Sequence, residues 1–250
     1  MMPKIAGNTD AEICGLLMEE YGKRGMEFKL SCKVLRVTSD SVIYEENGEE
    51  KEVKCDSVLM SAGRRPSTKG VGLENLGIEM DRSAIVTDRH MCTNVPGVYA
   101  VGDCNGKLML AHTAYREAEV AVNHMLGIKD EMKYNSIASV LYTDPEVASV
   151  GESKQSAEAK GMNVKEVKLP MMFSGRYVAE NQGGKGFIKL VVDVDKKRLV
   201  GCHMVGNYSS EIIMTAAMMI DTELPPERLK KLVFPHPSVS EIIREAIFHI

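Results

Sequence analysis

The sequence has no long apolar run. No stretch reaches the roughly 18 consecutive apolar residues that a membrane-spanning helix needs. The first residues also lack the uninterrupted apolar core of a signal peptide. We therefore expect a cytoplasmic protein that has no membrane partner.

An excess of charge of one sign is also missing. The 31 lysines and arginines are scattered among 35 aspartates and glutamates, which gives a formal net charge of −4. A protein that binds nucleic acid usually carries its basic residues in a cluster, and the sequence contains no such cluster. Nucleic acid is therefore not an expected partner.

Paired cysteines and glycine-rich phosphate loops are absent too. The cysteines form no C-x-x-C or C-x4-C pair, which favours reduced structural thiols and predicts no metal site. No G-x-G-x-x-G occurs, so the strand, turn and helix that receive a pyrophosphate in a doubly wound domain cannot be recognised. The six cysteines are Cys14, Cys32, Cys55, Cys92, Cys104 and Cys202.

The composition that remains is globular, with 44% apolar and 26% charged residues. Because there are 17 methionines and no tryptophan, we expect methionine to fill gaps in the core. Apolar periodicity predicts helices over 10–24, 109–125, 152–161, 208–220 and 238–248. It predicts strands over 26–37, 41–44, 50–55, 57–61, 98–101, 138–143, 164–169, 186–193 and 198–205, with a hairpin at Asn47-Gly48.

The last seventeen residues contain a histidine held between two prolines. Pro235 and Pro237 restrict the backbone on either side of His236, and Glu241 follows five residues later at the start of an apolar-periodic helix. Ser238 and Glu241 fit a capping box, in which each side chain accepts a hydrogen bond from the other residue's backbone amide. Two interpretations stay open. Glu241 is a helix cap, or it orients the imidazole as a general acid or base.

Residues 236–246, His-Pro-Ser-Val-Ser-Glu-Ile-Ile-Arg-Glu-Ala, resemble the C-terminal signature of the dihydrolipoamide dehydrogenases, a family of flavin-dependent pyridine nucleotide-disulfide oxidoreductases. The resemblance implies that His236 and Glu241 form a catalytic pair. The chain departs from the usual pattern at Phe234-Pro235, where His-Ala is common, and at Ser238, where threonine is common. Neither departure touches the pair.

Four further segments resemble the same family, in the family's order. They are 61–68 (Ser-Ala-Gly-Arg-Arg-Pro-Ser-Thr), 93–103 (Thr-Asn-Val-Pro-Gly-Val-Tyr-Ala-Val-Gly-Asp), 109–112 (Met-Leu-Ala-His) and 142–151 (Tyr-Thr-Asp-Pro-Glu-Val-Ala-Ser-Val-Gly). The resemblance implies that Gly102 and Asp103 contact the ribityl chain of FAD. It places Met109, Leu110, Ala111 and His112 at the flavin ring, Gly63 close to a cofactor, and Val34 near the adenosine of NAD.

The resemblance also implies a domain order. We expect the end of an NAD-binding domain over 1–65, the end of an FAD-binding domain over 66–133, and an interface domain over 134–250. The fold class is then α/β, from partial doubly wound domains, followed by α+β. The apolar helix over 208–220 favours a homodimer, because a helix that is apolar almost all round is covered on two sides.

The family's glycine-rich FAD fingerprint and its C-x4-C redox disulfide are both missing from this chain. The sequence is therefore interpreted as a portion of a flavin-dependent dihydrolipoamide dehydrogenase that is inactive alone. Its parent would use FAD and NAD on the dihydrolipoyl groups of 2-oxo acid dehydrogenase or glycine cleavage complexes. We expect this chain alone to bind neither cofactor. The alternatives are a non-catalytic dimerising module, or a portion of a sibling disulfide reductase or transhydrogenase.

Overall fold

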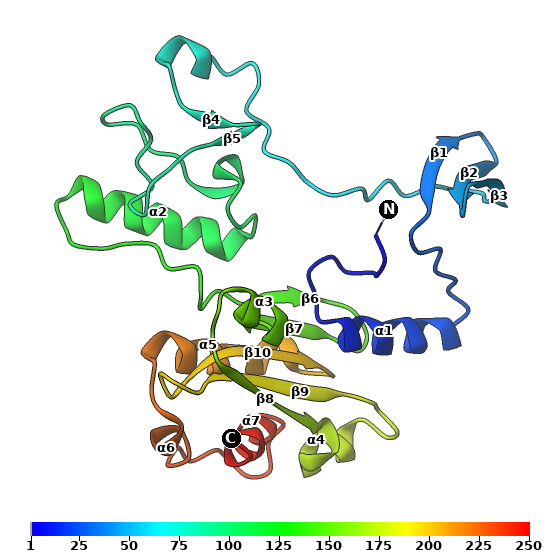
Figure 1. The fold of residues 1–250 in the computed structure, drawn as a ribbon, viewed down its shortest axis with the longest axis vertical. Coiled ribbons are helices and arrows are strands. Elements are labelled where there is room, and N and C mark those ends of the chain that lie inside the picture. Colours follow the sequence, from blue (N-terminus) through cyan, green and yellow to red (C-terminus); the bar gives the residue numbers. More distant parts are fainter. Residues whose placement is uncertain (1) are drawn as a thin grey trace. The chain divides into compact units, whose positions relative to one another are not determined.

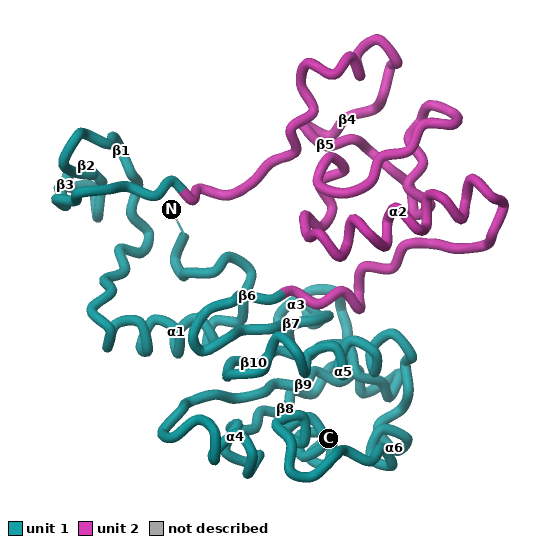
Figure 2. Tube along the Cα trace, turned by 180° about the vertical axis from the view of Figure 1, so that it is seen from behind, with its two compact units in different colours: residues 1–60, 140–250 teal, residues 61–139 magenta. Residues whose placement is uncertain are grey.

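The computed structural model describes residues 2–250, which form two compact units (Figures 1 and 2). One unit contains the chain up to residue 60 together with 140–250, and the other contains 61–139. Met1, the first residue of the expected 1–65 segment, lies outside the described residues. Among the helices that residues 2–250 form, none combines the length and apolar composition needed to cross a membrane.

The first unit is built around a five-stranded sheet. Its strand order is β6 (Ser139–Leu141), β7 (Val147–Gly151), β10 (Arg198–Val205), β9 (Phe187–Asp193) and β8 (Val164–Pro170). The pairings of β7 with β10, β10 with β9 and β9 with β8 are all antiparallel. Every residue of β9 is buried, so both faces of the sheet are covered.

Helices cover this sheet. Helix α5 (Ser209–Thr222) packs on β7 and β10, and α7 (Glu241–Phe248) packs on β8 and β9. Ile13 and Leu17 of α1 (Ala11–Lys23) join a core cluster with residues of β7, β9 and β10. The shorter helices of this unit are α3 (Lys154–Ala159), α4 (Gly175–Glu180) and α6 (Pro226–Leu229), and the 3-10 turn η3 covers Met171–Phe173. The expected α+β architecture is confirmed.

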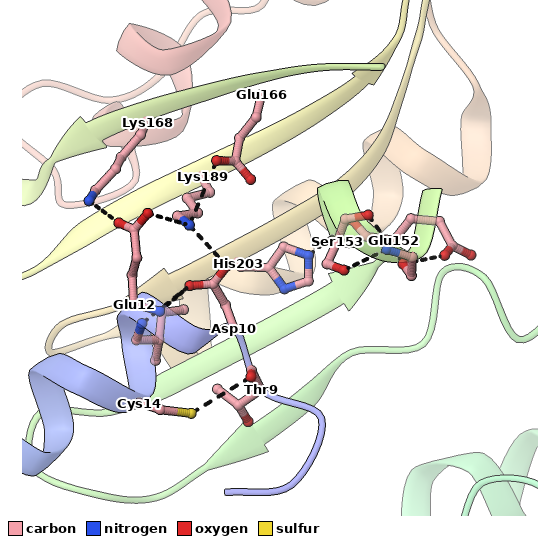
Figure 3. Close-up of polar contacts among 12 residues, drawn as sticks. Thr9, Asp10, Glu12, Cys14, Glu152, Ser153, Glu166, Lys168, Lys189 and His203 are labelled. Carbon is pink, nitrogen blue, oxygen red and sulfur yellow. Dashed lines mark hydrogen bonds and ion pairs between the residues drawn. The ribbon is translucent and has the colours of Figure 1, made fainter. Parts of the chain in front are cut away.

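The predicted helix over 10–24 is α1, and its first turn shows why it begins there. The Asp10 carboxylate accepts hydrogen bonds from the amides of Glu12 and Ile13, 2.9 and 3.2 Å away, as an N-cap residue does. The second carboxylate oxygen lies 2.9 Å from Nζ of Lys189 in β9, whose side chain is only 4% exposed. Figure 3 shows this ion pair joining the start of α1 to the sheet.

The hairpin is present at Asn47-Gly48, where both residues have positive φ. It belongs to a three-stranded antiparallel sheet of β1 (Lys33–Val37), β2 (Ser41–Glu46) and β3 (Glu49–Lys54). Two predictions were wrong here. The strand expected over 26–37 covers only β1, and the strand expected over 57–61 does not form. No described residue pairs with 57–61, so its apolar side chains stay exposed, Leu59 at 91%.

The second unit contains one long helix, α2 (Ala111–Met125), which matches the prediction over 109–125. Its other elements are η1 (Leu73–Leu76), β4 (Met80–Asp81), β5 (Ala84–Ile85) and η2 (Gly102–Asn105). The strand predicted over 98–101 is not formed. The backbone there makes a single bridge between Cys92 and Tyr99, because no described strand lies alongside to extend the pairing. Ala100 is nevertheless buried, as its apolar pattern indicates.

Candidate functional site

The predicted histidine and glutamate are in contact. Nδ1 of His236 lies 2.9 Å from Oε1 of Glu241, the first residue of α7. The other carboxylate oxygen accepts a 2.8 Å hydrogen bond from the backbone amide of Ser238. The His236 side chain is 82% exposed, whereas that of Glu241 is only 19% exposed. Glu241 is therefore fixed at both oxygens and holds an imidazole that faces solvent.

The capping box is only half formed. The hydroxyl of Ser238 lies 2.9 Å from the hydroxyl of Ser240 and makes no bond to the Glu241 amide. The helix begins at Glu241, three residues later than predicted, and Ser240 supplies no side-chain cap. The carboxylate arm of the box is present, so Glu241 contacts both the Ser238 amide and the imidazole of His236. The Ser238 amide, and then His236, hold the pKa of Glu241 below its ordinary value.

This contact also fixes the chemistry of the imidazole. A carboxylate oxygen can only accept a hydrogen bond, so Nδ1 of His236 carries the proton and donates a hydrogen bond to Glu241. In the neutral ring, Nε2 then carries the lone pair and can accept a proton. A carboxylate beside Nδ1 also stabilises the positive charge that forms when Nε2 takes one. The pair therefore has the arrangement of an oriented general base.

Gly102 and Asp103 begin the turn η2. Gly102 has a φ of +78°, and a Cβ placed on it would lie 3.3 Å from the Cβ of Ala114 in α2. Glycine is therefore required both by the backbone conformation and by the close approach of the helix. The Asp103 side chain is 51% exposed, and one carboxylate oxygen lies 4.0 Å from Arg64. Asp103 is thus available to a ligand.

Residues 109–112 lead into α2, whose N-terminus is uncapped by any described side chain. His112 directs its ring away from a capping role, because Nε2 donates to the carbonyl oxygen of Ala138 at 2.8 Å. The buried Thr113 hydroxyl on the same turn makes no hydrogen bond with the described residues. Free amides at a helix N-terminus stabilise negative charge, so this turn suits an electron-rich group.

Val34 belongs to the first unit and Gly63 to the second. Val34 is on β1, opposite Tyr44, and is 59% exposed, so it is not the core residue that a strand valine usually is. Gly63 has a φ of +107°, and no atom lies within 4 Å of the place where its Cβ would be. Open space at Gly63 would allow a ligand to approach its backbone. The proposed contacts of both residues with a cofactor stay predictions.

The sequence analysis missed Glu117. This residue is fully buried in α2, and its carboxylate contacts the turn that contains Gly102 and Asp103. The signal for it was available, because Glu117 lies four residues after Thr113 and three before Val120, on the buried stripe of an amphipathic helix. A charged side chain on such a stripe needs partners.

The remaining candidates for site chemistry are the cysteines and the side chains that could bind a metal ion. All six cysteines are free thiols. Burial raises the pKa of the Cys202 thiol, which favours its neutral form. Among residues 2–250 no three His, Cys, Asp or Glu side chains gather in a way that could hold a metal ion.

Two family models together cover most of the chain. The model described as pyridine nucleotide-disulphide oxidoreductase matches residues 1–118, and the model for the dimerisation domain of the same proteins matches residues 137–247. The second match covers the five-stranded sheet, α5 and the His236–Glu241 pair.

Curated relatives and solved structures agree with these matches. Dihydrolipoyl dehydrogenase 3 of Pseudomonas putida is 34% identical over the whole chain, which covers 54% of that protein. The mitochondrial dihydrolipoyl dehydrogenase of Schizosaccharomyces pombe is 34% identical over 98% of the chain and 49% of its own length. The crystal structure of LpdA from Mycobacterium tuberculosis matches with a TM-score of 0.89 and 27% identity, over 99% of this chain and 55% of that one.

The chain thus spans about half the length of the curated relatives that it matches. The resemblance inferred from the sequence motifs is confirmed, and the chain belongs to the pyridine nucleotide-disulphide oxidoreductase family.

Proposed function

We propose that the chain is a portion of an FAD-dependent dihydrolipoamide dehydrogenase. The observation that carries this proposal is the 2.9 Å contact between Nδ1 of His236 and Oε1 of Glu241, within a segment that matches the family's dimerisation domain. His236 is the base that takes a thiol proton from the dihydrolipoyl group at Nε2. Glu241 orients the ring and stabilises its positive charge.

The FAD contacts in this proposal come from the second unit. Bound FAD would supply the electron transfer between a dithiol and NAD. Gly102 and Asp103 would hold its ribityl chain, because Asp103 is exposed and the positive φ of Gly102 shapes the turn that carries it. Met109, Leu110, Ala111 and His112 would place the N-terminus of α2 against the electron-rich side of the ring. Val34 would lie near the adenosine of NAD, and Gly63 would let a cofactor approach its backbone.

Two chemical parts of this reaction have no counterpart in the chain. It has neither the glycine-rich fingerprint for the FAD pyrophosphate nor the C-x4-C disulfide. The protein as described here is therefore proposed to be inactive alone. The proposed substrates of the parent are the dihydrolipoyl groups of 2-oxo acid dehydrogenase or glycine cleavage complexes. Six free cysteines support a reducing, cytoplasmic location.

A homodimer completes the proposal. The match to a dimerisation domain supports it, and so does the exposed face of α5. Met214 and Met218 lie one helical turn apart and are 57% and 58% exposed, whereas Ile213, Ala217 and Ile220 of the same helix are buried. Burying two exposed methionines against a second copy would recover hydrophobic free energy.

The experiment compares the chain alone with the same chain joined to the FAD fingerprint and disulfide half of a dihydrolipoyl dehydrogenase. The chain alone should purify colourless, because the pyrophosphate contacts are lost and each roughly 1.4 kcal/mol of lost binding costs tenfold in affinity. The joined protein should be yellow and should reduce NAD with dihydrolipoamide. Near-stoichiometric flavin in the chain alone would contradict the first expectation. A joined protein that binds flavin and dimerises without turnover would instead favour the non-catalytic module.

A further inference from the structure

We propose that Glu117 is a positioning residue that holds the Gly102–Asp103 turn in its ligand-binding conformation. Oε2 of Glu117 accepts hydrogen bonds from the Gly102 amide at 2.6 Å and from Nδ2 of Asn105 at 2.8 Å. Oε1 accepts a 2.7 Å hydrogen bond from the hydroxyl of Tyr134. One carboxylate therefore joins α2, the turn η2 and the segment that follows α2.

The burial of this carboxylate is costly. Glu117 is 0% exposed, and no described lysine, arginine or histidine forms an ion pair with it. Burying a carboxylate is unfavourable unless hydrogen bonds replace its water, and the three donors supply that replacement. An apolar side chain of similar size would fill the same space without this cost. The carboxylate therefore has a use beyond packing.

That use follows from where the bonds fall along the chain. Val101, which precedes η2, offers no side-chain cap. The Gly102 amide donates its hydrogen bond to Glu117 of α2 instead. Glu117 also holds Asn105, whose own Oδ1 accepts from the Lys107 amide at 3.0 Å. Asp103 is thus fixed by one anchor before it and one after it, and its carboxylate direction depends on both.

Tyr134 supplies the third hydrogen bond, to the carboxylate oxygen that does not contact the turn. Burial, and then the hydrogen bond to Glu117, raise the pKa of Tyr134, so its hydroxyl stays protonated and keeps donating. The inference rests on the proposed flavin role of Gly102 and Asp103. Its test uses no flavin, so a failure of the positioning role and a failure of the proposed function can be told apart.

The test is hydrogen exchange of individual amides in the chain and in four variants. Glu117→Leu removes the acceptors and keeps the volume. Glu117→Asp keeps the charge on a shorter side chain, which moves it away from the turn. This variant tests the proposal if Glu117→Leu does not fold. Glu117→Gln can keep all three contacts, because its oxygen accepts from Gly102 and Asn105 while its amide donates to the Tyr134 hydroxyl. Tyr134→Phe is the control, since it removes only the contact remote from the turn.

The Gly102 amide should exchange roughly tenfold faster or more in Glu117→Leu and Glu117→Asp, while Val120 and Ala121 in the core of α2 change by less than about threefold. Glu117→Gln should restore Gly102 to within about threefold of the wild type. Two results would overturn the proposal. One is an unchanged Gly102 amide in both damaging variants. The other is equal acceleration of Gly102, Val120 and Ala121, which marks a general loss of stability.

Discussion

The backbone of Gly102 has a φ of +78°, and a Cβ there would meet the Cβ of Ala114 at 3.3 Å. Conformation and crowding therefore act at the same residue. Gly127, just beyond α2, has the positive φ without the crowding, because its φ is +73° and no atom lies within 4 Å of its Cβ position. The two glycines differ mainly in the neighbour that a side chain would touch.

We predict that Gly127→Ala lowers the free energy of unfolding by roughly 1 kcal/mol, the cost of a left-handed backbone for a residue with a Cβ. Gly102→Ala should cost about 1 kcal/mol more, because Ala114 must also move. Chemical denaturation of both variants checks this. Equal losses would show that crowding at Gly102 carries no energy.

Single residues also show how far the sequence could be interpreted. The family resemblance predicted the pairing of His236 with Glu241, because their spacing alone fitted a helix cap as well as an oriented imidazole. The contact of Ser238 could not be predicted, since its hydroxyl hydrogen-bonds to the Ser240 hydroxyl and not to the helix amide. The amphipathic pattern of α2 places Glu117 on the buried stripe, but local spacing could not predict its hydrogen bond to the Gly102 amide, fifteen positions earlier in the chain.

At the scale of elements, periodicity predicted those whose apolar side chains pack within their own unit. Helices α1, α2 and α5 and strands β8, β9 and β10 lie where the pattern placed them. Strand β7 was missed because Val147–Gly151 is short and was interpreted only as a family motif. The strands predicted over 57–61 and 98–101 failed because a strand needs hydrogen-bonding neighbours as well as an apolar pattern.

The docking of α1 depends on charge as well as on apolar contacts. Besides Asp10, Nζ of Lys189 lies 3.2 Å from Glu12 and 3.7 Å from Glu166, and Lys168 pairs with Glu12 (Figure 3). Burial opposes ionisation of Asp10, but the Lys189 hydrogen bond and the amides of Ile13 and Glu12 together bring its pKa below 3.8. Nearby in β10, His203 donates from Nε2 to the Glu152 carbonyl oxygen at 3.0 Å, and burial lowers its pKa below 6.5.

These directions predict a two-step loss of stability in acid. A lowered histidine pKa means that the folded state prefers neutral His203, so its contribution is complete above about pH 6.5 and falls as the unfolded chain takes up a proton. The contribution of Asp10 is complete above about pH 3.8 and is lost as the pH falls through its lower folded pKa. His203→Gln should remove the step that begins near pH 6.5 and leave the step below about pH 4. Denaturant unfolding across this range measures both steps.

The ion pair between Asp10 and Lys189 should show a large single-mutant effect and a smaller double-mutant effect. Asp10→Asn keeps the helix cap but leaves Lys189 buried without its nearest charge, so it should cost about 3 kcal/mol at neutral pH. Adding Lys189→Met removes a buried charge that then has only Glu12 and Glu166 as partners, and should restore about half of that loss or more. Strictly additive losses in the double variant would contradict the coupling.

At the scale of the whole molecule, α5 presents one face to the sheet and Met214 and Met218 to solvent. We predict that Met214→Asp with Met218→Asp converts a dimer to monomer at about micromolar concentration, because a buried unpaired charge at an interface costs several kcal/mol. Sedimentation velocity measures the change. Leu126→Asp is the matched control, since Leu126 is 69% exposed at the end of α2 in the other unit and should leave the dimer intact. A wild-type monomer under the same conditions would contradict the proposed assembly.

The central claim is that His236 acts as a base oriented by Glu241, and its most direct test is the rate at which dihydrolipoamide reduces the joined protein, followed by stopped flow. His236→Ala should slow this half-reaction by roughly 10²–10⁴ while flavin content and melting temperature stay nearly unchanged. Glu241→Gln should also slow it, because the new amide donates to Nδ1 and leaves the proton on Nε2, where the base is needed. The control is His249→Ala, an exposed histidine at the end of the same helix, which should react at the wild-type rate. An unchanged rate in both His236→Ala and Glu241→Gln would contradict the role of His236 as an oriented base. Glu241 would then be only the cap of α7.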